Sequence, residues 1–104
     1  TKAGKVVSGE EACERVIKAG KAKLVIVADD ASERTKRKFK SICNYNGVKL
    51  KFFGEKIFLG KFIGKEARSV IAVLGKEFAE RLGEMIEGIN IESGGEQIGE
   101  SQNL

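Results

Sequence analysis

The chain alternates short, wholly apolar segments with amphipathic ones. Two uninterrupted apolar runs, Leu24–Ala28 and Val70–Leu74, lack the polar alternation of a half-exposed strand, so each is predicted to be a strand buried on both faces. In a third segment, residues 48–52, Val, Leu and Phe alternate with two lysines. This pattern predicts a strand with one wet face or at a sheet edge.

A first helix is predicted before these strands. Ser8 is a favourable N-cap, and Glu11 stands three residues later, at the spacing by which a carboxylate reaches back to the cap amide. Gly20 is the expected C-terminal stop. Ser8, Gly9, Glu10 and Glu11 are expected to face outward, beside Lys5 and Arg15. The inward positions are expected to be Cys13, Val16 and Ile17.

Three further helices are predicted between or after the strands, at Ser32–Tyr45, Glu55–Lys61 and Lys76–Glu87. Asn46 and Gly47 should end the first of these. The inward side chains are expected to be Thr35, Phe39, Ile42 and Cys43 in the first, Ile57, Phe58 and Leu59 in the second, and Phe78, Ala79, Leu82 and Ile86 in the third.

Strands separated by helices indicate an α/β fold around a small, partly parallel sheet. With 104 residues, 41% of them hydrophobic, the chain can form one ordinary core and is too short for two. Residues 1–87 are therefore expected to form the domain. Residues 88–104 are acidic, glycine-rich and without a periodic apolar face, which predicts a disordered tail. Because no apolar run reaches bilayer length, a soluble, cytoplasmic protein is expected.

Charge and cysteine content narrow the chemistry. All nineteen Lys and Arg, but only twelve of the fifteen Asp and Glu, lie in residues 1–87, which gives this part a formal charge of +7. Such a body favours polyanions such as RNA. The chain has two cysteines and no histidine, so neither a zinc site nor a thiol–imidazole pair is expected. Cys13 and Cys43 are predicted to be buried apolar residues.

Three segments contain residue types that could serve catalysis or binding. The stretch GKFIGKEA (60–67) is not a phosphate loop, because three residues separate its glycines and a glutamate follows its second lysine. Asp29 and Asp30 follow a central strand, where α/β enzymes place chemistry, but a turn or cap role before the next helix is favoured. The basic run Arg34–Lys40 is explained by a solvated helix face, with phosphate binding as the alternative.

The order of four segments, AGKVVSGEEA, KAKLVIVADDAS, CNYNGV and LGKFIGKEARSVIAV, resembles the kink-turn RNA-binding ribosomal-protein superfamily, often called L-seven-Ae-like, and within it the bacterial YlxQ-like branch. The resemblance covers residues 3 to about 87. It implies a three-layer α/β/α sandwich with a small mixed sheet of about four strands. It also implies a non-enzymatic protein that binds a sharply bent RNA with tandem sheared G·A pairs.

The resemblance assigns a first RNA contact to the start of the first helix. The family pattern there is Gly, any residue, Asn, Glu, two residues, then Lys, and it falls on Gly9, Glu11, Ala12 and Arg15. Gly9 allows close backbone approach, and Arg15 can make two hydrogen bonds to guanine. Glu11 cannot donate as Asn does, and Ala12 lacks the carboxylate. Lys5 and Ser8 are included in this expected RNA-binding surface.

A second RNA contact is implied for the loop that begins at Gly64 and contains Lys65, Glu66, Ala67 and Arg68. In this loop Lys65 and Arg68 are expected mainly to contact phosphate. The spacing of Phe52, Phe58 and Phe62 fits core packing, so none is assigned to RNA.

The sequence therefore predicts a monomeric protein that clamps a bent, purine-rich internal loop of structured RNA, such as ribosomal RNA. It predicts no cofactor, no metal, no membrane partner and no small-molecule substrate. Two alternatives stay open. One is a protein–protein interaction module on the same fold, since the Asn and Glu of the family pattern are missing. The other, more remote, is the RNA-recognition part of a modifying enzyme.

Overall fold

The computed structural model describes the backbone of residues 5–98 and the side chains of residues 5–88. The elements follow the chain in the order β1 (Val6–Ser8), α1 (Glu10–Lys18), β2 (Leu24–Val27), α2 (Glu33–Asn46), β3 (Lys49–Phe52), α3 (Lys56–Phe62), β4 (Val70–Val73) and α4 (Lys76–Ile98).

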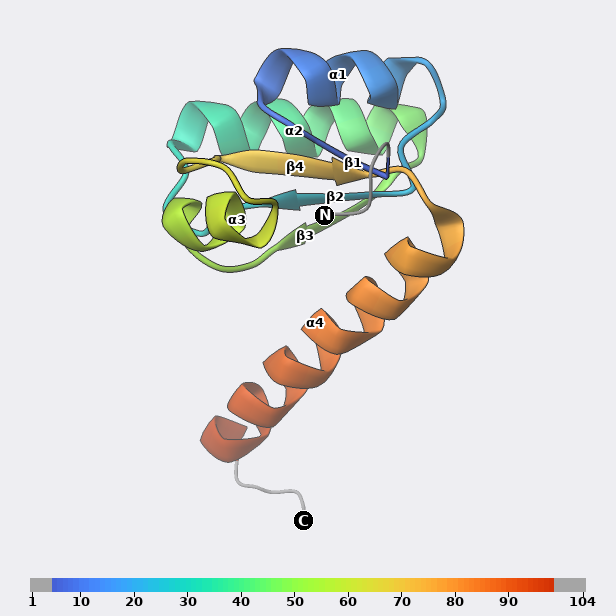
Figure 1. Cartoon of the computed structure of the whole chain (residues 1–104). Coiled ribbons are helices and arrows are strands. Elements are labelled where there is room, and N and C mark those ends of the chain that lie inside the picture. The colour runs from blue at the N-terminus through green and yellow to red at the C-terminus, as the bar shows by residue number, and fades with distance from the viewer. Residues whose placement is uncertain (1–4, 99–104) are drawn as a thin grey trace.

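The four strands form one mixed sheet in the order β1-β4-β2-β3. Strands β1 and β2 run antiparallel to β4, and β3 runs parallel to β2. Helices α1 and α2 cover one face of the sheet, and α3 and α4 lie on the other (Figure 1). The predicted three-layer α/β/α sandwich is confirmed.

The central strands are the two that carry continuous apolar runs. Every residue of β2 and β4 is buried, because helices pack on both faces of the sheet. Strand β3 lies at the edge of the sheet, as predicted, but its burial does not alternate: Lys49 is exposed, and Leu50, Lys51 and Phe52 are half-buried. The short strand β1 was not predicted from periodicity, since it has three residues and two apolar side chains, and its pairing with β4 stabilises it.

The two cysteines lie between the helices of one layer and the sheet. Both are free and buried, as predicted. The Sγ of Cys13 lies 3.7 Å from the carbonyl oxygens of Val7 and Val70. Burial raises the pKa of the Cys13 thiol to about 12 and that of Cys43 to about 11. Both thiols are therefore neutral near pH 7, as expected of core residues.

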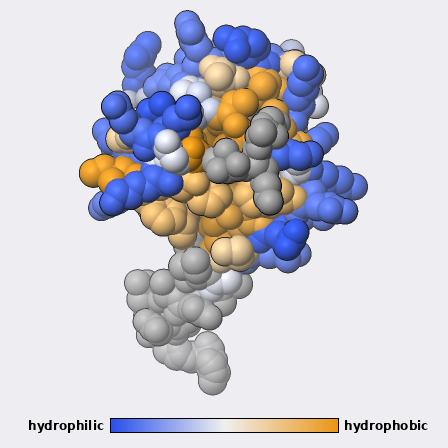
Figure 2. Space-filling view, viewed as in Figure 1, coloured by the Kyte–Doolittle hydropathy of each residue, from blue (hydrophilic) through white to orange (hydrophobic). Residues whose placement is uncertain are grey.

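Helix α3 buries less of its apolar sequence than predicted. Leu59 is buried, but Ile57 is 62% exposed and Phe58 is 49% exposed, so the prediction that both face the core is wrong. Phe62, also assigned to the core, is 39% exposed and stacks on Phe78 of α4. The cause is helix geometry: with seven residues, α3 turns one narrow side to the sheet. Figure 2 shows the resulting apolar area between α3 and α4.

Helix α4 continues past its expected end at Glu87 to Ile98. The expected sheet-facing positions Ala79 and Ile86 are buried, and Phe78 and Leu82 are half-buried. The chain contains no proline, so nothing in the sequence forces the helix to stop at Gly88. The division between a domain and an acidic tail remains a prediction. Over the described part of the chain, no helix combines the length and the apolar character that a membrane span requires.

A helical glycine offers a test of how α4 packs. Gly83 is buried in α4, yet a Cβ added there would meet no atom within 4 Å. Gly83→Ala should therefore raise the free energy of unfolding by about 0.5–1 kcal/mol, because alanine loses less backbone entropy in a helix. Urea denaturation measures it. The matched control is Gly20→Ala, equally free of contacts but at φ +76°; it should destabilise. A loss of stability in Gly83→Ala would contradict this packing.

Candidate nucleic-acid interface

The segments predicted to contact RNA lie on one side of the sheet, where the strands end. We call this side, which runs across the strands, the edge. Strand pairing places Ser8 opposite Ile71, Val27 opposite Val70, and Val27 beside Phe52. The carboxyl ends of β1, β2 and β3 and the amino end of β4 therefore share this edge. The start of α1 follows β1 and the loop 64–68 precedes β4, so the two segments predicted to contact RNA lie at the same place.

The N-cap of α1 is Gly9, with φ 92° and ψ 151°. This is a conformation that residues with a Cβ rarely adopt. Its N–H donates to the carbonyl oxygen of Val70 at 3.1 Å, and the position of a Cβ at Gly9 is open space. No side chain caps α1, so its first backbone N–H groups point toward the open edge. Another backbone can approach closely here.

The predicted capping box is wrong. Ser8 is the last residue of β1, not the N-cap, and Glu11 is exposed and makes no cap hydrogen bond. Strand pairing with Ile71 holds Ser8 in extended geometry. The Oγ of Ser8 instead accepts a hydrogen bond from Nε of Arg68 at 3.1 Å.

Arg68 joins the two predicted contact segments into one surface. Besides its bond to Ser8, its Nη1 donates to the carbonyl oxygens of Glu66 (3.2 Å) and Ala67 (3.0 Å). Its backbone N–H donates to the carbonyl of Lys56 at 2.9 Å. The side chain is half-buried. Arg68 thus fixes the loop against both β1 and α3, a positioning role that residue type and charge had not indicated.

The loop also depends on Gly60 of α3. A Cβ at Gly60 would lie 1.9 Å from the carbonyl oxygen of Glu66, so only glycine allows the loop to pack this closely. The backbone N–H of Lys65 donates to the Gly60 carbonyl at 2.7 Å. The side chains of Lys65, Glu66 and Ala67 are exposed. The loop therefore presents one lysine and one glutamate to solvent on a fixed backbone.

The acidic residues at the start of α1 are not equivalent. Glu10, expected to face outward, accepts a hydrogen bond from Oγ1 of Thr35 at 2.8 Å and pairs with Lys38 at 3.6 Å. Glu14 pairs with the same lysine at 3.1 Å and with Lys18 at 2.7 Å. These partners lower the pKa of Glu14. Glu11 and Arg15 are exposed and Ala12 is half-buried. One uncompensated carboxylate, Glu11, therefore stands at the helix start.

Lys5 lies at the other end of β1. Its carbonyl accepts from the N–H of Leu74 at 2.6 Å, and its Cδ lies 3.2 Å from the Cβ position of Gly75. It is separated from Gly9 by the whole strand, so the structure does not bring Lys5 together with the other predicted residues.

Of the two aspartates after β2, the side chain of Asp30 has a structural role at this edge, while Asp29 donates its backbone N–H to the carbonyl of Gly54 at 2.7 Å. Oδ1 of Asp30 accepts from the backbone N–H of Lys56 at 2.8 Å, at the start of α3, while Ser32 is the residue that caps α2. The predicted turn or cap role before α2 is partly right: Asp30 lies in a turn before α2, but its side chain binds the first residue of α3 and does not cap α2. Its partner lies 26 residues away, so local pattern could not identify it.

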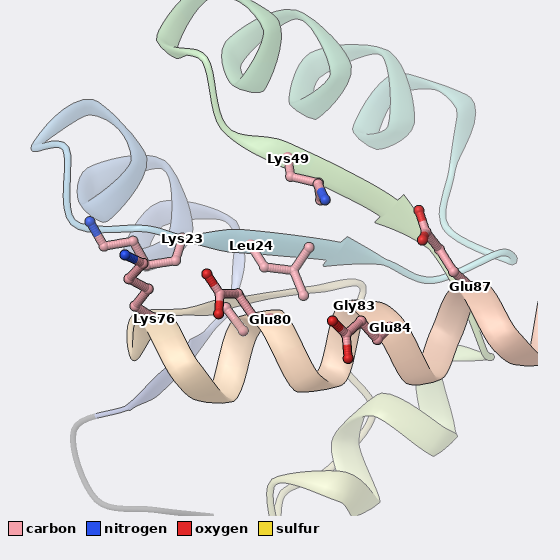
Figure 3. Close-up of a pocket in the computed structure, with 9 residues that line it drawn as sticks. Lys23, Leu24, Lys49, Lys76, Glu80, Gly83, Glu84 and Glu87 are labelled. Carbon is pink, nitrogen blue, oxygen red and sulfur yellow. The ribbon is translucent and has the colours of Figure 1, made fainter.

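A different cavity, of about 470 Å³, lies at the opposite edge of the sheet (Figure 3). Lys23 and Lys49, near the amino ends of β2 and β3, face α4, which contributes Lys76 and three glutamates. Glu87 is bound by Lys51, which lowers the pKa of that carboxyl. The basic and acidic side chains of this cavity balance, so it offers no net attraction for a polyanion.

Comparisons with known proteins identify the family of the chain. The model of the ribosomal protein L7Ae/L30e/S12e/Gadd45 family matches residues 1–83. The RNA-binding protein YlxQ of Bacillus subtilis (strain 168) is 44% identical over 81 residues, which are 78% of this chain and 81% of that protein. The RNA-binding protein YlxQ of Enterococcus faecium is 39% identical over 87 residues, 84% of each chain.

Among solved structures, a protein with unknown function from Bacillus halodurans C aligns with a TM-score of 0.79 and 32% identity, covering 83% of this chain and 87% of that one. The family match extends over most of the chain, and it includes both the helix start at Gly9 and the loop fixed by Arg68. The chain therefore belongs to the ribosomal protein L7Ae/L30e/S12e/Gadd45 family, in its YlxQ-like branch.

Proposed function

We propose that this protein is a non-enzymatic, cytoplasmic RNA-binding protein that recognises a kink-turn or a similar bent, purine-rich internal loop. The relatives in Bacillus subtilis and Enterococcus faecium are named as RNA-binding proteins. The bend of the RNA lies against the sheet edge, between the start of α1 and the loop 64–68. Binding the bent form more tightly than the extended form shifts the RNA population toward the bend.

The observation that carries the proposal is the hydrogen bond from Arg68 to Ser8. It joins into one surface two segments that are 60 residues apart in sequence. A sharply bent RNA presents two closely spaced backbone segments, and a surface with two fixed contacts distinguishes that shape from a straight duplex. The first contact offers backbone N–H groups beside Gly9, and the second offers Lys65.

The charges around the start of α1 favour phosphate binding more than the presence of Glu10 and Glu11 suggests. A phosphate near the α1 start meets the positive end of a helix dipole and an exposed Arg15. Glu10 does not oppose it strongly, because Lys38 neutralises that carboxylate. Glu11 remains as a carboxylate that repels phosphate and cannot donate a hydrogen bond to guanine. Specificity for guanine therefore depends on Arg15.

Arg15→Ala should weaken binding to a kink-turn RNA by about 1–3 kcal/mol, the range for a bidentate arginine–guanine contact. The fold should hardly change, because the side chain is exposed. Arg81→Ala is the matched control: it removes another exposed arginine, from α4 on the other face of the sheet. Titration of both variants with labelled RNA measures the effect. Equal affinities for the two variants would show that Arg15 makes no contact with a base.

A protein-interaction module is the second candidate function. One observation favours it: the partly exposed apolar side chains of Phe58, Phe62 and Met85 line an apolar pocket between α3 and α4 (Figure 2). This pocket lies on the face of the sheet opposite α1. Structured RNA that stays with the purified protein and is released by ribonuclease would favour RNA binding over this candidate.

A further inference from the structure

Helix α2 packs beside the edge strand β3, and an open groove lies between them. Two adjoining cavities make up this groove, of about 310 Å³ and about 560 Å³, and they share Arg37 and Lys40. The smaller cavity is near the carboxyl end of β3 and is also lined by Asp29, Glu33, Lys36 and Phe52. We call the two together the α2–β3 groove.

The shared residues are two of the three α2 cations that take part in no ion pair among the described side chains; the third, Arg34, does not line the groove. Lys38 pairs with Glu10 and Glu14 on α1, and Lys36 pairs with Glu33 at 3.7 Å. Within the side chains that the structure describes, Arg37 and Lys40 take part in no ion pair, and both are exposed. Spaced three apart on a helix, they lie on the same flank. Their charges are therefore free to attract an anion.

The larger cavity has the chemistry of a sugar–phosphate site. Its remaining lining is Ser41, Cys43, Asn44, Val48 and Leu50, with no acidic side chain. Arg37 and Lys40 can bind phosphate oxygens, Ser41 and Asn44 can hydrogen-bond ribose hydroxyls, and the apolar floor can contact the sugar ring. Tyr45, 90% exposed, follows on the last turn of α2.

The groove begins at the edge of the sheet that carries the proposed RNA surface. Phe52 lines the groove and pairs with Val27 at that edge, which also holds Ser8. Strand β3 is three strand positions from β1, a distance of about 14 Å at usual strand spacing. That is less than half of one turn of duplex, about 34 Å. One RNA molecule can therefore reach both places.

We propose that the α2–β3 groove holds the backbone of a strand that flanks the bent RNA element, with Arg37 and Lys40 as its phosphate contacts. This inference rests on the proposed function and extends it: the protein binds RNA beyond the bend. The carboxylates of Asp29 and Glu33 lie at the end of the groove nearer the bend, so the phosphate contacts concentrate in the larger, acid-free cavity.

The test uses the full chain and two RNAs, a minimal kink-turn and the same kink-turn with each flanking strand extended. Arg37→Gln/Lys40→Gln should bind the extended RNA at least tenfold more weakly than wild type, and the minimal RNA within about threefold. The dependence of log affinity on log salt should become shallower by about 1.4–1.8 for the extended RNA, since two phosphate contacts are lost. Melting curves check that the variant is folded.

The matched control, Lys21→Gln/Arg81→Gln, removes one lysine and one arginine that are exposed away from the groove. It should reduce affinity less than threefold for both RNAs. The proposal is overturned if the groove variant binds the extended RNA as the control does, as expected if a protein strand occupies the groove. It is also overturned if the groove variant loses affinity equally for both RNAs. Failure of the proposed function gives a different result, because the wild-type protein would then bind kinked and unkinked RNA with equal affinity.

Discussion

Gly60→Ala is expected to lower the free energy of unfolding by about 2–4 kcal/mol, the largest effect of any single substitution considered for this chain. The added Cβ would lie 1.9 Å from the carbonyl oxygen of Glu66 and 2.5 Å from its carbonyl carbon. Both are backbone atoms, so no side-chain rotation relieves the clash. Relief requires the loop 64–68 to move away from α3 and to break the bond from Lys65 to Gly60.

Gly60→Ala should therefore lower both the free energy of unfolding, measured by urea denaturation, and the affinity for RNA, measured by titration. Gly83→Ala serves as the opposite control, because it adds the same methyl group to a helix without a clash. If Gly60→Ala were as stable as wild type, the loop would not be packed against Gly60 as described, and the second RNA contact would lose its structural basis.

Arg68→Ala is expected to weaken binding to a kink-turn RNA at least tenfold, the largest expected effect on binding. The change removes one hydrogen bond to Ser8 and two to loop carbonyls, so the loop and the start of α1 no longer form one surface. Arg68→Lys should recover only part of the loss, because an ammonium keeps the charge but cannot reproduce the planar arrangement of donors.

Comparison of the two variants distinguishes positioning from charge. If Arg68→Lys binds as wild type, charge alone suffices, and the bridge to Ser8 does not hold the surface together. Ser8→Ala removes only the acceptor of the bridge and leaves all charges in place. It should weaken RNA binding in the same direction, by less than Arg68→Ala.

Much of the fold follows from local pattern. The apolar runs at residues 24–28 and 70–74 identified the two central strands, because only strands covered on both faces remain apolar without alternation. Helix α2 was predicted to within one residue at each end, since Ser32 and Gly47 provide strong start and stop signals. Strand β1 escaped prediction because three residues carry little periodicity and its stability comes from β4, more than 60 residues later.

The position of the candidate site follows from family resemblance, but the contacts within it join residues far apart in sequence and could not be predicted. That Ser8 accepts a bond from Arg68, that Glu10 binds Thr35, and that Asp30 serves α3 are contacts across 60, 25 and 26 residues. Residue types alone permitted Ser8 to be a cap and Glu10 to face solvent. The exposure of Ile57 and Phe58 has another cause: the seven-residue helix α3 turns only one narrow side to the sheet, so apolar residues on its other sides stay exposed, as much apolar surface does in folded proteins.

The central claim is that the edge formed by Gly9, Arg15 and Arg68 recognises the bent RNA. The most direct measurement compares the affinity of the wild-type protein for a kink-turn RNA with its affinity for an RNA of the same length in which Watson–Crick pairs replace the sheared G·A pairs. We expect the kink-turn to bind at least tenfold more tightly, about 1.4 kcal/mol. Glu11→Asn/Ala12→Glu should widen that difference, because it restores a donor and an acceptor for guanine at unchanged net charge. Equal affinity of the wild-type protein for the two RNAs would contradict the account.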